Sequence, residues 1–375
     1  MDFTVLNDFL DKSVDKYCLP ALDVALTKGF ETVFRYQHNC DNNSYFMGYS
    51  STKVLVGAAA AKLIIEGKLS LDSPAGEFLP QLYDMNVYRR DESGMIVGTE
   101  KLSKDKPVLV KHLLTMTAGI ADNISTEYIK SALASGKKST QEIVAAILRE
   151  PLSFEPGSCY KYGLCLDVAA ALIEKVSGLS FSRYLEQNFF EPLDMGQASF
   201  HPTLEQRARL LKNHMWYEPG GYYYAIPEDN ELVFSSEYES GGAGLYFTAD
   251  DYIKFEIALA NDGVGANGNR ILPKSAVDLM RRPMLSEKNH KIFQEFMGMP
   301  GYSYGLCVRT MQNPVVAGYT TPPGEFGWQG KAGTYSSICP EKQASIFMGI
   351  QICDYHPVNI VMHNELREMA YDLLG

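Results

Sequence analysis

The 375-residue sequence lacks a membrane-spanning run, a metal-binding motif and a basic cluster. No apolar stretch reaches the roughly 18 to 20 residues that a membrane span needs, because Lys62 and Glu66 interrupt the longest one. The seven histidines show no HxH or HExxH spacing, so no metal site is expected. Lysine and arginine number 34 against 45 acidic residues, and the net charge of −11 argues against nucleic-acid binding.

Disulfide and export signals are also missing. The seven cysteines form no CxxC pair, and an odd number without an export signal suits reduced thiols better than a disulfide framework. Residues 1–17 have the pattern of an acidic amphipathic helix, not the basic start and apolar centre of a signal peptide. We therefore expect a cytoplasmic protein that binds no membrane. Nothing in the sequence indicates an oligomeric state.

The composition, with 46% hydrophobic and 21% charged residues, is that of a globular protein, and the length favours two lobes over one. Strand patterns lie toward both ends of the chain, at 22–37, 302–310, 333–339 and 344–353. Helical periodicity dominates 111–195. We predict an α+β fold in which residues 1–75 and 270–375 build a lobe with an antiparallel sheet flanked by helices. Residues 76–269 would form an inserted helical lobe, with the active site at the junction.

Two segments between these elements are interpreted as loops. Turn signals dominate residues 68–106. Residues 215–230, MWYEPGGYYYAIPEDN, are expected to form a long loop, because glycine and proline interrupt the aromatic residues without periodicity. This loop either packs between the lobes or forms a wall that faces the substrate.

The stretch GYSSTKVLVGAAAAKLII places Lys53 one helical turn after Ser50, at the head of an apolar helix. A serine hydroxyl becomes a strong nucleophile when a neighbouring base takes its proton, and a lysine amine can be that base where burial disfavours its charge. The alternative is that Ser50 or Ser51 only caps the helix while Lys53 is exposed.

Two further stretches contain residues of matching chemistry. Tyr162 follows a Pro-Gly turn and precedes an apolar helix, where its phenol could carry a proton between nucleophile and leaving group with Lys53 as the supporting cation. Residues 325–351 place glycine-rich backbone before a strand pair, where a backbone N–H can stabilise an oxyanion. Taken singly, Tyr162 could be a half-buried aromatic residue and 325–351 the start of a hairpin.

Together, in this order, the three stretches resemble the active-site motifs of the serine β-lactamase and penicillin-binding protein superfamily. The match is closest to class C β-lactamases and the related family VIII carboxylesterases, and it spans nearly the whole chain. Residues 67–80, 108–120 and 240–255 resemble further segments of that family. The resemblance implies a β-lactamase-like fold, with Ser50 as the acylated nucleophile, Lys53 as the lysine of SxxK and Tyr162 as the tyrosine of the second motif.

The second motif departs from the lactamase pattern. Leu164 stands where lactamases have an asparagine that binds the amide of the substrate, and leucine cannot make that hydrogen bond. The run from Tyr162 to Val168 instead resembles the esterase pattern, with Asp167 either as a residue that orients the site or as a helix N-cap. Cys159 and Cys165 flank Tyr162, and packing is favoured over a regulatory disulfide.

The third motif has two possible registers. Trp328-Gln329-Gly330 matches the Trp-x-Gly form of the esterase branch, and by that register the backbone N–H of Lys331 joins that of Ser50 in the oxyanion hole. The rival register takes Lys331-Ala332-Gly333 as the motif, which would restore a cation for a substrate carboxylate. The first register is favoured because Gly327 and the following Gly-Thr fit it.

These departures favour neutral, apolar acyl groups. We expect a serine hydrolase that forms a covalent acyl-enzyme without a cofactor, acting as a carboxylesterase on small or medium acyl esters with weak or no β-lactamase activity. Substrate contacts are expected from Leu164, Trp328, Gln329 and Gly330. The alternatives are a D-amino-acid peptidase or amidase, a β-lactamase, and a binding protein on this fold that has no activity.

Overall fold

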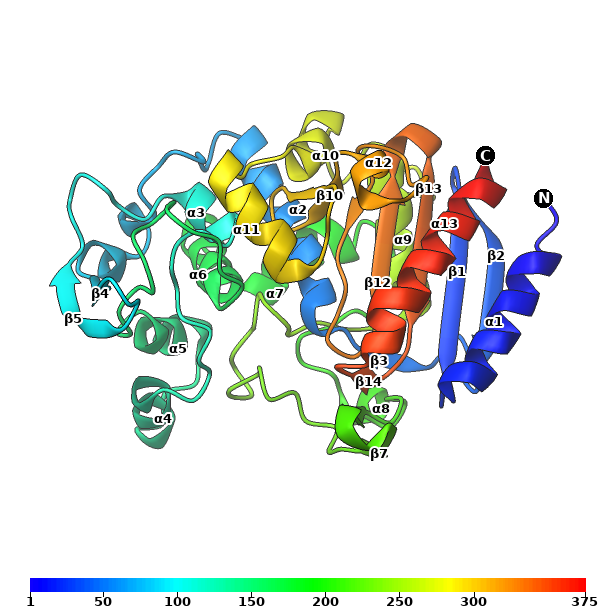
Figure 1. The fold of residues 1–375 in the computed structure, drawn as a ribbon, viewed down its shortest axis with the longest axis horizontal. Helices are drawn as coiled ribbons and strands as arrows, with labels where there is room; N and C mark the ends of the chain where they lie inside the picture. The colour runs from blue at the N-terminus through cyan, green and yellow to red at the C-terminus, as the bar shows by residue number, and fades with distance from the viewer.

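The computed structural model describes residues 1–375 and has a seven-stranded antiparallel sheet as its central element (Figure 1). The strand order is β2-β1-β13-β12-β11-β10-β9, so strands from both ends of the chain lie side by side. The strands are β1 (Leu22–Lys28), β2 (Glu31–His38), β9 (Tyr302–Tyr304), β10 (Arg309–Met311), β11 (Phe326–Gly327), β12 (Tyr335–Cys339) and β13 (Ala344–Gly349). The predicted α+β fold, with an antiparallel sheet built from both ends of the chain, is confirmed.

The two faces of the sheet are buried against different helices. On β13, Ile346 and Met348 belong to a core shared with α1 (Thr4–Tyr17) and α13 (His363–Leu374). Phe347 lies between them and packs on the other face, against Tyr252 of α9 (Ala249–Ala260). This alternation follows from the two-residue period of a strand, and each buried side chain of this size stabilises the fold by about 1.5–3 kcal/mol. The sheet therefore has hydrophobic cores on both sides.

The other half of the molecule is mainly helical and surrounds α2 (Thr52–Ile65) (Figure 1). Helix α2 is apolar on nearly all sides and is buried among α6 (Cys165–Ser177), α10 (Lys274–Arg281) and neighbouring segments. The remaining helices are α3 (Val110–Leu114), α4 (Glu127–Ala134), α5 (Thr140–Ile147), α7 (Phe181–Leu185), α8 (Leu204–Arg207), α11 (Glu287–Met297) and α12 (Pro314–Ala317). The division of the chain into lobes at residues 76 and 269 stays a prediction. Helix α9, which belongs to the range 76–269 predicted as the inserted lobe, packs on the sheet.

Both segments interpreted as loops contain hairpins. The aromatic run forms the hairpin of β6 (His214–Tyr217) and β7 (Tyr222–Ala225), which turns at Glu218–Gly220, and β6 also pairs with β14 (Ile352–Cys353). The prediction of a loop was wrong there because the Pro-Gly-Gly sequence is the turn of the hairpin. In the stretch 68–106, β4 (Asn86–Arg90) pairs with the exposed strand β5 (Ile96–Lys101). A short fourth pair joins β3 (Tyr45–Met47) to β8 (Tyr246–Thr248).

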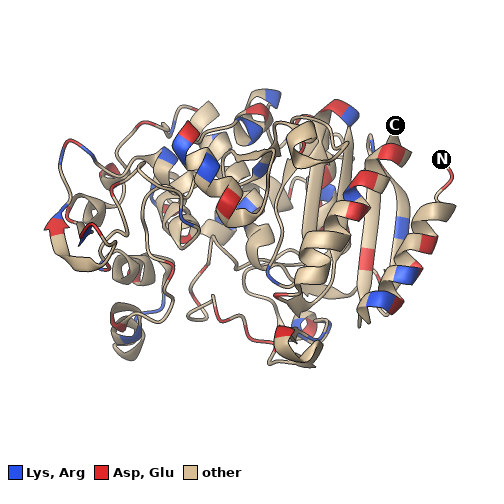
Figure 2. Ribbon diagram, in the orientation of Figure 1, with Lys and Arg blue, Asp and Glu red and all other residues tan.

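Charged residues of both signs are interspersed over the molecule (Figure 2). Acidic and basic residues both occur along α1, α10 and α11. None of the helices combines the length and the apolar composition that crossing a bilayer requires.

The contact between α13 and the sheet predicts a stability that depends on pH. Burial, together with Arg309, lowers the pKa of His363 to about 3, and the ring stacks on Tyr335 with centroids 4.4 Å apart. The charged form of His363 is disfavoured in the folded state. The contribution of the neutral ring to folding stability is therefore fully present above the unfolded pKa of about 6.5, and it is lost as the pH falls toward 3. We expect a loss of about 3 kcal/mol in unfolding free energy at pH 4 relative to pH 7.

The measurement is urea unfolding of the native protein and His363→Phe at several pH values. His363→Phe should remove most of this acid-dependent loss, whereas the exposed control His356→Phe should keep it. An equally steep loss in both variants would contradict the assignment to His363.

Candidate active site

Ser50 lies in a turn of 3₁₀-helix, Tyr49–Ser51, directly before α2. The preceding residue, Tyr49, is buried and adopts a left-handed conformation with φ 45°, which costs a non-glycine residue about 1–3 kcal/mol. Asn213 Nδ2 donates a hydrogen bond of 3.0 Å to the Tyr49 hydroxyl, and this contact helps to hold the turn. The backbone is thus bent where the sequence places the expected nucleophile.

Lys53 is in the first turn of α2, and only 3% of its surface is exposed. Its Nζ donates to Ser50 Oγ at 2.9 Å and to the carbonyl oxygen of Gly242 at 2.6 Å. The Ser51 side chain makes no capping bond, and its hydroxyl bonds Thr334 Oγ1 instead, at 2.8 Å. The alternative of a capping serine with an exposed lysine is therefore wrong.

Tyr162 comes from the loop before α6 and reaches the same hydroxyl. Its phenol donates to Ser50 Oγ at 2.9 Å, and Lys53 Nζ lies 4.8 Å from the centre of its ring. Trp328 stacks on this ring with centroids 5.8 Å apart and planes 14° apart, and its Nε1 donates to the phenol oxygen at 3.2 Å. The structure thus brings Ser50, Lys53 and Tyr162 together, as predicted, and adds an N–H donor on the phenol oxygen.

The third motif lies next to the turn of Ser50. Trp328 follows β11, and a side chain at Gly330 would place its Cβ 2.4 Å from the Gly48 carbonyl oxygen. Only glycine permits this approach, but Gly333 of the rival register is equally constrained, with φ 83° and a Cβ that would lie 2.3 Å from Ile350 Cγ1, so the register stays a prediction. The rival cation, Lys331, directs its Nζ to Glu231 Oε1 at 2.6 Å. The oxyanion hole formed by the amides of Ser50 and Lys331 stays a prediction.

Asp167 lies behind Lys53, in the first turn of α6, and is not an N-cap. Its Oδ1 accepts hydrogen bonds from the Tyr238 hydroxyl at 2.7 Å and from Ser240 Oγ at 2.6 Å. Burial raises the pKa of this carboxyl group. A side chain at Gly242 would place its Cβ 2.8 Å from Asp167 Oδ2. Asp167 therefore fixes the segment whose Gly242 carbonyl holds Lys53.

Ser50, Tyr162 and Leu232 line two cavities. The smaller, of about 150 Å³, is mostly apolar and is bounded by Ile124, Leu164, Leu232 and Ala243 as well as Lys53 and Asp122. The larger, of about 430 Å³, has Trp328, Gln329, Gly330 and Lys331 on one side and Phe296, Met297 and Ile360 on another. The predicted substrate contacts are thus divided between the cavities, with Leu164 in one and residues 328–330 in the other.

The cysteines beside Tyr162 do not form a disulfide. All seven thiols are free, and Cys165 is buried at the start of α6. Burial raises the pKa of the Cys165 thiol to about 12, so this group is a packing residue and not a reactive thiolate.

Sequence reasoning missed two polar contacts in this site. The Gly242 carbonyl could not be found because a backbone group that binds a lysine leaves no signal in the residue type. Trp328 was expected to offer an apolar face, whereas its indole N–H also donates to Tyr162. The Gly-rich run of residues 240–244 was the available signal for the first of these contacts.

Comparison with known proteins identifies the family of the chain. The profile of the Beta-lactamase family matches residues 6–355, so the chain belongs to that family. Esterase EstB from Burkholderia gladioli is 28% identical over 306 residues, covering 76% of this chain and 71% of the relative. The lovastatin esterase of Penicillium rubens is 27% identical, covering 75% of this chain and 71% of the relative.

Solved structures show the same fold. The unliganded simvastatin synthase LovD from Aspergillus terreus superimposes with a TM-score of 0.79 at 18% identity, covering 100% of this chain and 99% of that one. EstCE1, a hydrolase with promiscuous acyltransferase activity, has a TM-score of 0.77 at 18% identity and covers 97% of both chains. The predicted resemblance and fold are confirmed. With esterases among its relatives, the chain is a serine hydrolase.

Proposed function

We propose that the protein is a carboxylesterase in which Ser50 carries the acyl group. The observation that carries this proposal is the convergence of Lys53 Nζ and the Tyr162 hydroxyl on Ser50 Oγ, each at 2.9 Å. Two hydrogen-bonding groups of different acidity at one serine oxygen are the arrangement that proton transfer to and from a nucleophile needs.

The reaction runs in two steps. Ser50 Oγ attacks the ester carbonyl carbon while its proton passes to the Lys53–Tyr162 pair, and the resulting oxyanion is held by backbone N–H groups of Ser50 and Lys331. The C–O bond to the alcohol then breaks, and the alcohol leaves with that proton. Water attacks the acyl-enzyme by the same path, releasing the carboxylic acid and restoring the Ser50 hydroxyl.

The two cavities suggest where the parts of the ester lie. The smaller cavity is bounded in part by apolar side chains and has room for a short acyl chain, whereas the larger one would hold the alcohol. Leu164 bounds the smaller cavity at the position where a lactamase would bind a substrate amide. This replacement favours esters with apolar acyl groups over penicillins and D-amino-acid peptides.

Changing Leu164 should therefore shift the preferred acyl length. We expect Leu164→Ala to move the optimum among 4-nitrophenyl esters from short acyl chains to chains longer by two or more carbons. Leu164→Phe should confine activity to acetate. The measurement is kcat/KM over the acetate to decanoate series, with Ile360→Ala in the larger cavity as the matched control. An unchanged acyl profile in both Leu164 variants would place the acyl group elsewhere.

The direct test of the proposed function compares substrate classes. Short 4-nitrophenyl esters should be hydrolysed with a kcat/KM at least tenfold higher than a D-Ala-containing peptide or a cephalosporin. A higher rate on the peptide would replace the esterase assignment with a peptidase. A higher rate on the cephalosporin would replace it with a β-lactamase.

A second candidate function is acyl transfer to an alcohol in place of water. The larger cavity at Ser50 supports it, as does the simvastatin synthase among the structural relatives. Addition of a primary alcohol to an ester assay tests it. Transfer requires the ester of that alcohol to appear as product, whereas simple hydrolysis gives only the free acid.

We also propose that the protein acts in the cytoplasm. The support is that all seven cysteine thiols are free, since reduced thiols are typical of that compartment. Fractionation of cells should recover the enzyme with cytoplasmic markers, and recovery with an exported fraction would contradict this placement.

A further inference from the structure

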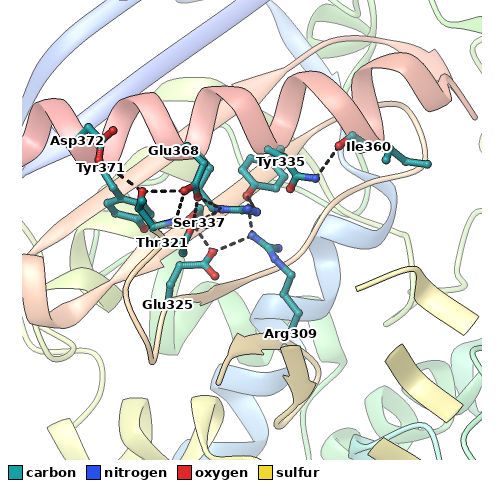
Figure 3. A network of polar contacts seen from close by, with 12 residues as sticks. Arg309, Thr321, Glu325, Tyr335, Ser337, Ile360, Glu368, Tyr371 and Asp372 are labelled. Atoms are coloured by element: carbon teal, nitrogen blue, oxygen red, sulfur yellow. Dashed lines mark hydrogen bonds and ion pairs between the residues drawn. The ribbon is translucent and has the colours of Figure 1, made fainter. Parts of the chain in front are cut away.

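Two networks of buried charged side chains lie outside the catalytic groups. The first joins β10 to α13, where Arg309 Nη2 donates to Glu325 Oε1 and to the Tyr335 hydroxyl, both at 2.9 Å (Figure 3). Arg367 Nη1 donates to the same hydroxyl at 3.2 Å. None of its hydrogen bonds reaches the catalytic groups, so this network joins α13 to the sheet. The second network surrounds Glu239, next to the segment whose carbonyl binds the catalytic lysine.

Glu239 is a buried carboxylate with three hydrogen-bond donors, and only 5% of its surface is exposed. Its Oε2 accepts from the backbone N–H of Ser182 at 2.6 Å and its Oε1 from the Ser182 hydroxyl at 2.7 Å, both in the first turn of α7. Oε1 also accepts from His201 Nε2 at 2.9 Å. Burial raises the pKa of this carboxyl group, but the hydrogen bonds from His201 and Ser182 outweigh burial and bring the pKa below its ordinary value. Glu239 is therefore charged and acts only as an acceptor.

The residue types of this cluster also occur in catalytic triads, but the connectivity differs. In a triad the histidine lies between the serine and the acid, whereas here Glu239 lies between Ser182 and His201. No hydrogen bond joins Ser182 to His201, so the buried serine hydroxyl has no base. The cluster instead joins α7, the loop that carries His201 and the segment that carries Glu239.

Residues 238–242 lead from this cluster to the catalytic lysine. The side chains on either side of Glu239 in sequence both bond Asp167, so the segment is held by two separate sets of partners. A Cβ at Gly241 would overlap a backbone carbonyl oxygen of α6, so the segment lies directly on that helix. Only three residues, at most about 11 Å of chain, then separate Glu239 from Gly242. A displacement at Glu239 therefore also moves the Gly242 carbonyl.

We propose that Glu239 is a positioning residue, which keeps the Gly242 carbonyl against Lys53 Nζ. His201 and Ser182 hold Glu239 in place. This inference rests on the proposed esterase function. The lysine amine must point at the nucleophile to take its proton, and the carbonyl 2.6 Å away fixes the direction of one of its N–H bonds. Glu239 lines neither cavity beside the nucleophile, so its loss should lower kcat and leave KM nearly unchanged.

The first test measures kcat and KM on 4-nitrophenyl butyrate. Glu239→Ala should lower kcat at least about tenfold and change KM less than about twofold. Glu239→Gln keeps an acceptor oxygen for α7 and should recover most of the lost rate. Failure of the native protein to hydrolyse any ester would remove the esterase function itself. Native hydrolysis with an unchanged kcat in Glu239→Ala would overturn only the positioning role.

Glu174→Ala is the matched control for a role that is only structural. Glu174 is a carboxylate of α6, and its Oε1 accepts from the backbone N–H of Phe181 at 3.1 Å, in the same turn of α7. It lies outside residues 238–242. Glu174→Ala should lower the melting temperature as Glu239→Ala does, but it should keep kcat within about twofold of the native value. An equal loss of kcat in both variants would assign the effect to α7 and overturn the proposal.

A double variant shows whether the effect passes through the lysine. Lys53→Ala removes the amine, so adding Glu239→Ala should slow fluorophosphonate labelling of Ser50 less than about twofold further. A further tenfold loss would show that Glu239 acts by another route, and it would overturn the proposal.

His201→Phe tests the same role without a change in the buried carboxylate. The His201 side chain is 44% exposed, so this variant should fold, and it removes one donor to Glu239. The value of kcat should fall at least about threefold, and His201→Gln, which restores an N–H donor, should recover it. If Glu239→Ala does not fold, an unchanged kcat in His201→Phe overturns the proposal on its own.

Discussion

Ser50→Ala should lower kcat/KM on 4-nitrophenyl butyrate by at least about 10⁴-fold, because it removes the atom that forms the acyl-enzyme. The hydroxyl forms hydrogen bonds only with the side chains of Lys53 and Tyr162, so its loss leaves the surrounding core in place. The melting temperature should therefore change little. Steady-state kinetics and circular dichroism on the same preparation measure both quantities.

The matched control is the adjacent serine. Ser51 is buried, and its hydroxyl bonds Thr334 Oγ1 rather than the catalytic groups. Ser51→Ala should keep the rate within about tenfold of the native protein, since a change outside the catalytic groups is not expected to cost more than one lost neutral hydrogen bond. A burst of 4-nitrophenol that persists in Ser50→Ala would remove Ser50 from the role of nucleophile.

Tyr162→Phe should slow acylation by roughly 10²- to 10⁴-fold, the range typical of a lost proton-transfer group. Phenylalanine keeps the ring that stacks on Trp328 and removes the hydroxyl that lies 2.9 Å from Ser50 Oγ. The loss should appear in kcat more than in KM, because the phenol acts on the moving proton and not on substrate binding. Single-turnover measurements of 4-nitrophenol release report the acylation step directly.

Tyr160→Phe provides the comparison for this variant. Tyr160 is two residues away and buried, and its hydroxyl has no hydrogen-bond partner. Its ring packs against Phe293 and Tyr304, contacts that phenylalanine preserves. This variant should therefore keep the native acylation rate. Equal acylation rates in Tyr162→Phe and the native enzyme would leave Lys53 as the only base.

Much of this site could be predicted from the sequence because helix geometry is local. The spacing of Ser50 and Lys53 places both on one face of a helix, and the apolar run after them predicts burial. Tyr162 was found only through the order of the three motifs, since no local rule connects it to a serine 112 positions earlier. The sheet was predictable from the two-residue periods at both ends of the chain.

The parts that could not be predicted depend on backbone atoms and on contacts between distant segments. The Gly242 carbonyl binds Lys53 whatever the side chain, so residue types do not reveal it. The hairpin of β6 and β7 was missed because its aromatic residues lack alternation and its pairing with β14 joins residues about 140 positions apart. The buried pair of Arg309 and Arg367 comes from a strand and a helix whose proximity only the fold establishes.

The most direct test of the account is to find which residue becomes acylated. A fluorophosphonate probe should modify the native enzyme once, and the tryptic peptide 36–53 should carry the adduct, with fragmentation placing it on Ser50 rather than Ser44 or Ser51. Addition of excess 4-nitrophenyl butyrate should slow the labelling. An adduct on another residue, or an active enzyme that the probe leaves unmodified, would contradict the assignment of Ser50 as nucleophile.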